Sequence, residues 1–336
     1  MHTLGARVAL MGVLVLRQMG IGPHVSPAPK AHATIEQLWL APRDLARRDV
    51  FVGSARQAEA PDIRQPMTFV SKKTSGFSPG FDVKDASGHE WSAKLGPEAQ
   101  TEVVASRILW ALGYHQAPTF YVRSWELRGG PSPGVQKGAR FRPKDRRLTS
   151  DGAWSWQHNP FIETQPYRGL LVLMLMLNST DLRNGNNVVY RAHGETPDRW
   201  YAVKDLGATL GATGVYRPSR NDIDAFEHDP FLVERGRRAR LTYKGLQKEL
   251  LRQLTPADFV WACDRLSELS DAQWRDAFRA GGYSDELSDR YIAALRARMK
   301  SARTLSARFD GEYADYWGAR QLRRIGHVFG AIGGIF

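Results

Sequence analysis

Polar side chains that could act on a phosphate group stand at four points of the chain. Lys94 ends an alternating stretch, and Glu102 follows in a helical pattern. Asp181-Leu-Arg-Asn-Gly-Asn186 forms one polar loop, and Asp205-Leu-Gly forms another. Transfer of phosphate from ATP needs a cation on the phosphates, oxygen ligands for magnesium and a carboxylate beside the attacking hydroxyl. We predict that Lys94, held by Glu102, is the cation. Asn186 and Asp205 are the expected metal ligands, and Asp181 is the expected catalytic carboxylate.

Each of these groups alone has an ordinary structural explanation. A lysine on a strand usually faces solvent, and a glutamate early in a helix favours the helix dipole. A loop rich in Asn and Gly is by default a turn. The hypothesis rests on their order along the chain, which is the order found in kinase-type phosphotransferases.

The elements that must position these groups begin with a run of short strands. Alternation and turn residues predict three strands, at residues 67–73, 81–84 and 89–95, joined as an antiparallel meander. Apolar residues at helical spacing predict a helix over 97–112, and a further strand is expected at 117–123. Residues 67–127 are therefore expected to form a small lobe, an antiparallel sheet with one helix.

The next stretch, residues 128–160, is rich in Gly, Pro and basic side chains, and we predict a loop or insertion between two lobes. Its densest basic part, residues 137–147, is expected to be a solvated loop. The alternative is an electropositive rim for an acidic or phosphorylated substrate.

A second, mostly helical lobe is predicted over residues 161–310, followed by a tail at 311–336. It contains a buried helix and a two-strand hairpin, at 167–177 and 187–204. Helix starts are expected at Thr255, Ser270 and Ser284, because each stands where an N-cap residue is favoured. The predicted fold class is therefore α+β with two lobes.

Composition narrows the classes of function. Of 336 residues, 42% are hydrophobic and 24% are charged, which is typical of a globular protein. The formal net charge of +12 attracts phosphates, but the basic stretch lacks the surroundings of a nucleic-acid module, so we expect no specific nucleic-acid partner. No apolar run approaches the length of a membrane span. The single cysteine, Cys263, excludes an internal disulfide and is expected in the core.

The N-terminal residues 1–33 have features of an export signal. Arg7 precedes an apolar run, and Ala31-His-Ala33 offers a small-x-small cleavage site. We expect a periplasmic or secreted protein; a disordered tail on a cytoplasmic protein is the alternative. Residues 34–66 are interpreted as an extension that leads into the first lobe.

Two loops carry a family resemblance. The stretch from Asp181 to Tyr190, followed by Ala202-Val-Lys-Asp205-Leu-Gly-Ala-Thr-Leu-Gly211, resembles the catalytic and metal loops of atypical kinases. The similar branches are the phosphatidylinositol-kinase-like, HipA-like and secretory-pathway kinases. The wider stretch, about residues 68–295, also resembles a group of bacterial proteins of unassigned function.

The resemblance implies a kinase-like fold that binds ATP with Mg²⁺ or Mn²⁺. It implies phosphate transfer to a hydroxyl group of a protein, a lipid or a small molecule. The loop 76–80 stands where such kinases cover the phosphates, so Gly76 and Gly80 are its candidate contacts, although the spacing departs from Gly-x-Gly-x-x-Gly. Two other interpretations stay open: a kinase-shaped binding module without transfer activity, and an exported structural protein.

Overall fold

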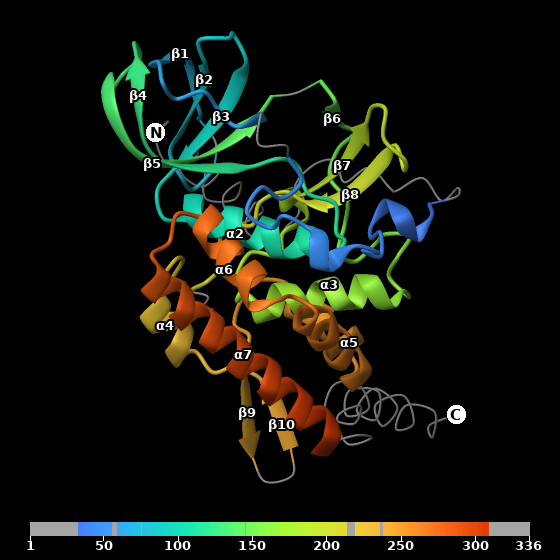
Figure 1. The fold of residues 1–336 in the computed structure, drawn as a ribbon. Coiled ribbons are helices and arrows are strands. Elements are labelled where there is room, and N and C mark those ends of the chain that lie inside the picture. Colours follow the sequence, from blue (N-terminus) through green and yellow to red (C-terminus); the bar gives the residue numbers. More distant parts are fainter. Residues whose placement is uncertain are drawn as a thin grey trace, which may run out of the picture.

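The computed structural model describes residues 33–55, 59–74, 76–144, 146–213, 219–235 and 238–308. The predicted export signal lies outside these residues except for its last position, Ala33, and the tail at 311–336 lies outside them entirely. The described chain is a mixed α+β fold, with a β-barrel at one end and a group of helices at the other (Figure 1).

Five strands close the barrel, in the order β1-β2-β3-β5-β4. They are β1 (Met67–Lys72), β2 (Gly80–Lys84), β3 (Glu90–Leu95), β4 (Phe120–Arg128) and β5 (Gly134–Pro143). The first three form the predicted antiparallel meander. A parallel pairing of β1 with β4 completes the closure. Alternate apolar side chains from the strands, among them Trp91, Ala93 and Phe141, fill the interior.

Strand β5 corrects the prediction for residues 128–160. That stretch was expected to be a loop or an insertion, yet β5 pairs with both β3 and β4 in the middle of the sheet. Ala139 and Phe141 are fully buried in the barrel interior. Arg140 and Arg142 alternate with these two residues along β5. They gave the stretch the sequence pattern of a solvated basic loop. Only the later part, toward strand β6 (Leu148–Ser150), leads away from the barrel.

Helix α2 (Glu98–Ala111) lies between the barrel and the other helices (Figure 1). Its apolar residues, including Val104 and Ile108, belong to the main core shared with the helices rather than to the barrel interior. The helix therefore packs on the helical end of the fold as well as on the barrel strands β3, β4 and β5. The helix stops before Gly113, where φ is +100° and an added Cβ would meet the carbonyl oxygen of Leu40 at 2.3 Å.

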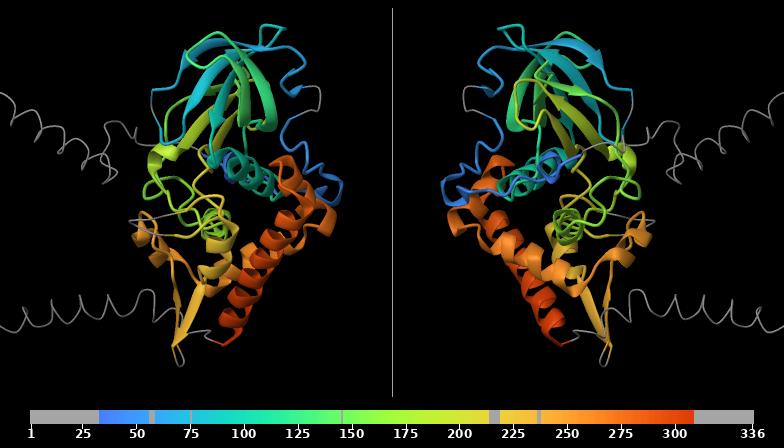
Figure 2. Two further views of the ribbon diagram at one scale, coloured as in Figure 1. Left: turned by 90° about the vertical axis from the view of Figure 1, so that its left-hand side faces the viewer. Right: turned by 90° about the vertical axis from the view of Figure 1, so that its right-hand side faces the viewer.

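The remaining helices gather around α3 (Gln165–Met176), which is almost entirely buried (Figure 2). They are α4 (Ile223–His228), α5 (Pro256–Ser267), α6 (Asp271–Ala280) and α7 (Asp285–Arg308). Thr255 and Ser270 form capping boxes at the predicted starts of α5 and α6. Cys263 is fully buried, as expected. A small hairpin of β9 (Leu232–Arg235) and β10 (Arg238–Leu241) projects below them.

A three-stranded sheet connects the two ends of the molecule. It has the order β6-β7-β8, in which β7 (Asn187–Ala192) and β8 (Arg199–Val203) form the predicted hairpin. The hairpin carries the chain from the loop at Asp181 to the turn at Asp205.

The segment 33–55 differs from its prediction as an extension toward the first lobe. It contains two short 3₁₀ helices, η1 (Ile35–Gln37) and η2 (Leu45–Arg47), and Leu38 and Val50 are fully buried in the main core. The indole of Trp39 donates to the Leu112 carbonyl at 2.7 Å. This segment is therefore part of the helical end of the fold.

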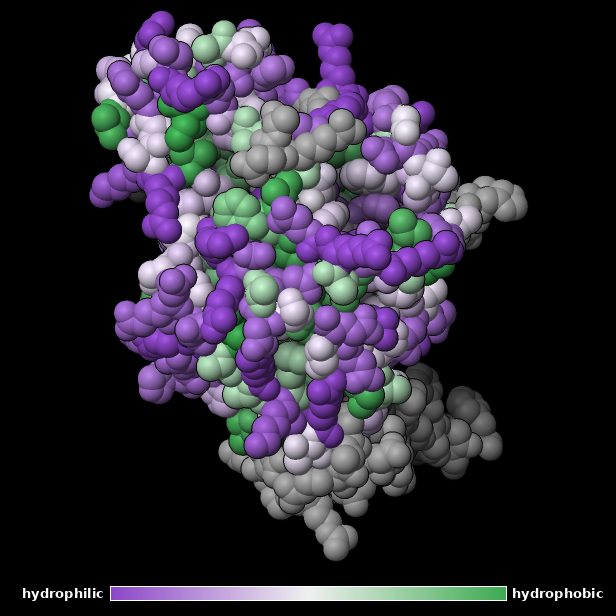
Figure 3. Space-filling model, in the orientation of Figure 1, coloured by the Kyte–Doolittle hydropathy of each residue, from purple (hydrophilic) through white to green (hydrophobic). Residues whose placement is uncertain are grey.

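The surface of the face seen in Figure 1 is mainly hydrophilic, with small apolar patches scattered over it (Figure 3). Among the described helices, none is long and apolar enough to cross a membrane.

Candidate active site

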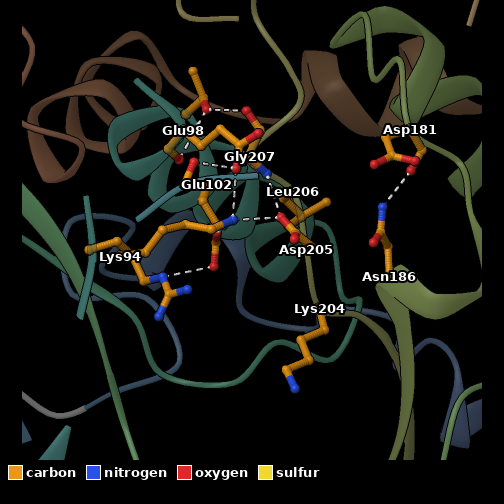
Figure 4. Close-up of polar contacts among 12 residues, drawn as sticks. Lys94, Glu98, Glu102, Asp181, Asn186, Lys204, Asp205, Leu206 and Gly207 are labelled. Atoms are coloured by element: carbon orange, nitrogen blue, oxygen red, sulfur yellow. Dashed lines mark hydrogen bonds and ion pairs between the residues drawn. The ribbon is translucent and has the colours of Figure 1, made fainter. Parts of the chain in front are cut away.

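The centre of the candidate site is the ammonium group of Lys94 on β3. Because Trp91 and Ala93 point into the barrel, alternation places Lys94 on the outer face, toward α2. Its Nζ lies 2.8 Å from Glu102 and 2.8 Å from Asp205 (Figure 4). The predicted contact between Lys94 and Glu102 is thus present. The nitrogen also lies 3.1 Å from Glu98, so both glutamates of α2 hold the same lysine.

Glu102 is buried and binds two arginines in addition to the lysine. Its Oε1 lies 2.9 Å from Arg140 and 2.6 Å from Arg142. Burial alone would raise the pKa of Glu102, but the positive charges of Arg140, Lys94 and Arg142 outweigh it and lower the pKa well below the usual range. Burial would likewise lower the pKa of Lys94, and the carboxylates around it raise the pKa instead. Both groups are therefore charged at neutral pH.

The two arginines are site residues that the sequence analysis missed. Arg140 pairs directly opposite Lys94 in the β3–β5 register, and its Nη1 donates to the Ser92 carbonyl at 2.9 Å. Arg142 Nη2 donates to the Lys204 carbonyl at 2.8 Å, which ties β5 to the end of β8. Alternation of Ala139 and Phe141 with these arginines indicates a strand with both arginines on one face, but not that this strand lies beside Lys94.

Two further lysines add positive charge around the arginines. Lys73 donates to the Ser92 hydroxyl, and burial together with the charge of Arg140 lowers the pKa of Lys73 to about 8. Burial and the charges of Arg142 and Arg140 also lower the pKa of Lys204. Burial is the larger cause of both shifts and the neighbouring arginines add to it, so these lysines bring further positive charge close to the arginines.

The turn that begins at Asp205 is fastened to α2. Thr101 on that helix donates to the Gly207 carbonyl at 2.8 Å. The Gly207 amide lies 3.3 Å from Asp205 Oδ1, and a Cβ added at Gly207 would lie 2.6 Å from Glu98 Cβ. The side chain of Asp205 is 44% exposed, so its carboxylate is accessible to solvent. Helix α2 thus positions both Lys94 and Asp205.

The predicted catalytic loop lies beside that turn. The backbone amide of Asp205 donates to the Asn186 carbonyl at 3.1 Å, so the β7–β8 hairpin brings the two residues together as expected. The Asn186 amide nitrogen donates to the Asp181 carbonyl at 2.8 Å. Both carboxylate oxygens of Asp181 bind the guanidinium of Arg183. Asp181 is therefore engaged by its own neighbour in this conformation.

Asn186 and Asp205 each have a side-chain oxygen atom that is available to a metal ion. Asn186 Oδ1 and Asp205 Oδ2 accept no hydrogen bond from the described residues, and both are the hard donors that Mg²⁺ prefers. The donor set fits magnesium that shares its remaining ligands with phosphate and water. In Figure 4 the Asp205 side chain is directed toward Lys94 and the Asn186 side chain toward Asp181. Within the described residues, His, Cys, Asp and Glu form no group of three suited to a metal ion.

The loop 76–80 folds down onto the same cluster. Ser78 donates to Glu98 Oε2 at 2.8 Å, and the guanidinium of Arg220 lies 4.0 Å from the ring centroid of Phe77 and 2.8 Å from Glu98. A Cβ added at Gly80 would lie 2.5 Å from the Ala93 carbonyl oxygen, so this glycine serves the close packing of β2 on β3.

Gly76 is the other glycine of this loop. It has a φ of +100° and open space around its Cα, so it permits the turn that the loop makes.

Comparisons with known proteins return limited similarity. No protein-family model matches the chain, and no curated protein matches it. Among solved structures, the chain is similar to the crystal structure of a Helicobacter pylori proinflammatory kinase, CtkA. The two share 13% sequence identity with a TM-score of 0.44, over 72% of this chain and 99% of that one. Support for a function therefore comes from the side chains of the site.

Proposed function

We propose that this protein is an ATP- and magnesium-dependent phosphotransferase that acts on a hydroxyl acceptor. The observation that carries the proposal is the position of Lys94, whose nitrogen is held by buried Glu102 and also touches Asp205. A lysine that is fixed by a carboxylate and adjoins an exposed carboxylate is the arrangement that ATP phosphates and their metal ion require. Mn²⁺ could replace Mg²⁺ on the same oxygen ligands.

The residues take distinct roles under this proposal. Lys94 binds the phosphates of ATP, within the positive potential of Arg140 and Arg142. Asn186 and Asp205 would hold the magnesium ion, which neutralises phosphate charge when bound. Asp205 Oδ1 is 2.8 Å from Lys94, so nucleotide and metal ion would bind next to each other.

Asp181 would act on the acceptor. Its carboxylate orients the acceptor hydroxyl and takes its proton, while the acceptor oxygen bonds to the terminal phosphorus and the bond to ADP breaks. For this, one oxygen of Asp181 has to leave Arg183. Arg183 would remain on the other oxygen and keep the carboxylate oriented.

One observation favours a second candidate, a nucleotide-binding module of kinase-like shape without transfer. Arg183 occupies both oxygens of Asp181, which leaves no free carboxylate oxygen for an acceptor in this conformation. Both candidates require nucleotide binding at Lys94, and they differ in turnover.

Release of ADP from ATP with magnesium separates the two. Asp181→Ala is expected to lower ADP release by about 10²–10⁴-fold, the range of a lost general base, while nucleotide affinity stays near that of the wild type. Asp151→Ala, which removes a surface partner of Arg191, is the matched control and should leave the rate unchanged. Wild-type protein that binds ATP without releasing ADP would support the binding module. Equal rates for wild type and Asp181→Ala would contradict the role of Asp181.

A further inference from the structure

A cavity lies beside Arg142, at the end of β5. It has a volume of about 150 Å³ and is bounded by the end of β5, the strands β6 to β8 and the turn after α2. Its lining includes Gln116, Arg142, Leu148, Tyr190 and Trp200. A cavity of this size holds a small ring compound rather than a single water molecule.

The cavity presents polar groups that the described residues leave unpaired, and one of them, Arg142 Nε, is buried. Gln116 is 5% exposed and Tyr190 is 6% exposed. Within the described part of the chain, neither the Gln116 amide nor the Tyr190 hydroxyl forms a side-chain hydrogen bond. Arg142 uses only Nη2 toward Glu102 and Lys204, and its Nε and Nη1 donate to none of the described residues. Buried polar groups are usually paired, so Arg142 Nε points to a ligand with hydrogen-bond acceptors, which the Gln116 amide and the Tyr190 hydroxyl could also bind.

The rest of the lining is apolar and partly flat. Ala117, Pro118 and Leu148 contribute apolar surface. The ring of Trp200 is held by stacking on His115, with centroids 4.8 Å apart and an interplanar angle of 10°. A fixed aromatic wall beside small apolar side chains suits a planar ring.

The inner end carries the guanidinium of Arg142. Arg142 shares Glu102 with Lys94 and Arg140, and Lys94 is also held by Glu98 and Asp205. The lining glutamates act elsewhere: Glu59 pairs with Arg147 at 3.0 Å, and Glu195 lies on the exposed rim. We propose that this cavity is a binding site for a small planar carboxylate, with the acid on Arg142, Tyr190 and Gln116 and the ring against Trp200. The inference does not depend on the proposed phosphotransferase activity, because no nucleotide takes part in it.

Calorimetric titration of the full chain with benzoate, and with benzamide as its neutral counterpart, tests the proposal. A compound of this size is expected to bind with a Kd of about 1 mM or below. Benzamide should bind at least about 10-fold more weakly, because it lacks the charge-assisted hydrogen bonds. Gln116→Leu and Tyr190→Phe should each weaken benzoate about 3- to 10-fold through one lost hydrogen bond.

Leu148→Trp fills the cavity and should abolish benzoate binding. Leu287→Trp, a substitution at an exposed position on α7, is its control and should bind like the wild type. If Leu148→Trp fails to fold, Gln116→Leu and Tyr190→Phe decide the question. The proposal is overturned if the wild type does not bind benzoate at about 10 mM, well above the expected Kd. It is also overturned if benzamide binds as well as benzoate, or if folded Leu148→Trp binds benzoate like the wild type.

Discussion

At the residue scale, the site is a buried group of charges whose members fix one another. Glu102 carries one negative charge and meets Lys94, Arg140 and Arg142 within 2.6–2.9 Å. Buried ion pairs of this kind contribute little net stability, because desolvation offsets their attraction. Their effect is to hold Lys94 in one position. Lys94 also meets Glu98 and Asp205, so the carboxylates balance the charges of the lysine and the two arginines.

The lysine pair could be predicted from sequence, and the arginine pair could not. Lys94 and Glu102 stand at the end of a strand and the start of a helix joined by a short link, so proximity follows from chain geometry. Arg140 reaches Glu102 only because β5 inserts between β3 and β4, a pairing across many residues. Local alternation gives no information on which strand becomes the neighbour.

Lys73 allows a pH test of a lysine that is partly buried beside Arg140. Its pKa is lowered from 10.5 to about 8, by burial first and by Arg140 second. Between those two values the unfolded chain binds more protons than the folded one, so this lysine penalises folding at neutral pH and the penalty disappears as pH rises through 8 toward 10.5. Lys73→Met should therefore stabilise the protein at pH 7 and have a smaller effect near pH 10.

Urea unfolding at the two pH values measures this difference. Lys72→Met, at the exposed neighbouring position, is the control and should show no such pH dependence. A Lys73→Met effect that is the same at both pH values would show that the lysine pKa is not lowered in the folded protein.

At the scale of elements, α2 is the part that organises the site. It carries Glu98 and Glu102 to Lys94, and Thr101 to the turn at Gly207. The meander, the β7–β8 hairpin and the capped helices could be predicted from alternation, turn residues and N-caps. The packing of α2 on the helical end could not be predicted, because nearly every side of this helix is buried and its sequence lacks a single apolar face.

Gly207→Ala tests the fastening of the Asp205 turn to α2. The added Cβ would lie 2.6 Å from Glu98 Cβ, so either the turn or the helix has to shift. We expect a loss of about 1–3 kcal/mol in the free energy of unfolding, as in other overpacked sites, together with weaker nucleotide binding.

Gly185→Ala is the matched control, because nothing lies within 4 Å of an added Cβ there. Its effect on unfolding should stay within about 0.5 kcal/mol. Chemical denaturation measures both variants, and equal costs would mean that the turn is not packed against α2.

At the scale of the whole molecule, the barrel and the helices are joined by α2 and by the β6–β8 sheet, and the segment 33–55 docks on the helical end. The change from strands to helices along the chain could be predicted from the sequence. The barrel closure through β1 and β4 and the docking of residues 33–55 could not be predicted, because both depend on contacts between distant parts of the chain.

Leu38→Ala tests whether the segment 33–55 belongs to the fold. Leu38 is fully buried in the main core, so its truncation should cost about 2–5 kcal/mol of unfolding free energy. Leu40→Ala, at a site 45% exposed, should cost less than about 0.5 kcal/mol. Thermal and urea unfolding report both, and a small cost for Leu38→Ala would show that this segment is a detachable extension.

The most direct test of the proposed activity is thermal unfolding with ATP, with and without magnesium. At a hundredfold excess over its Kd, a ligand adds about 2.7 kcal/mol, or about 4 °C in Tm for a chain of this size. The wild type should show a shift that needs magnesium. Asp205→Ala should lose the magnesium-dependent part, whereas Asp264→Ala, a change at an exposed ion pair with Arg303, should keep it. Wild-type protein without a magnesium-dependent shift at millimolar ATP, or an unchanged shift in Asp205→Ala, would contradict a metal–nucleotide site at Lys94 and Asp205.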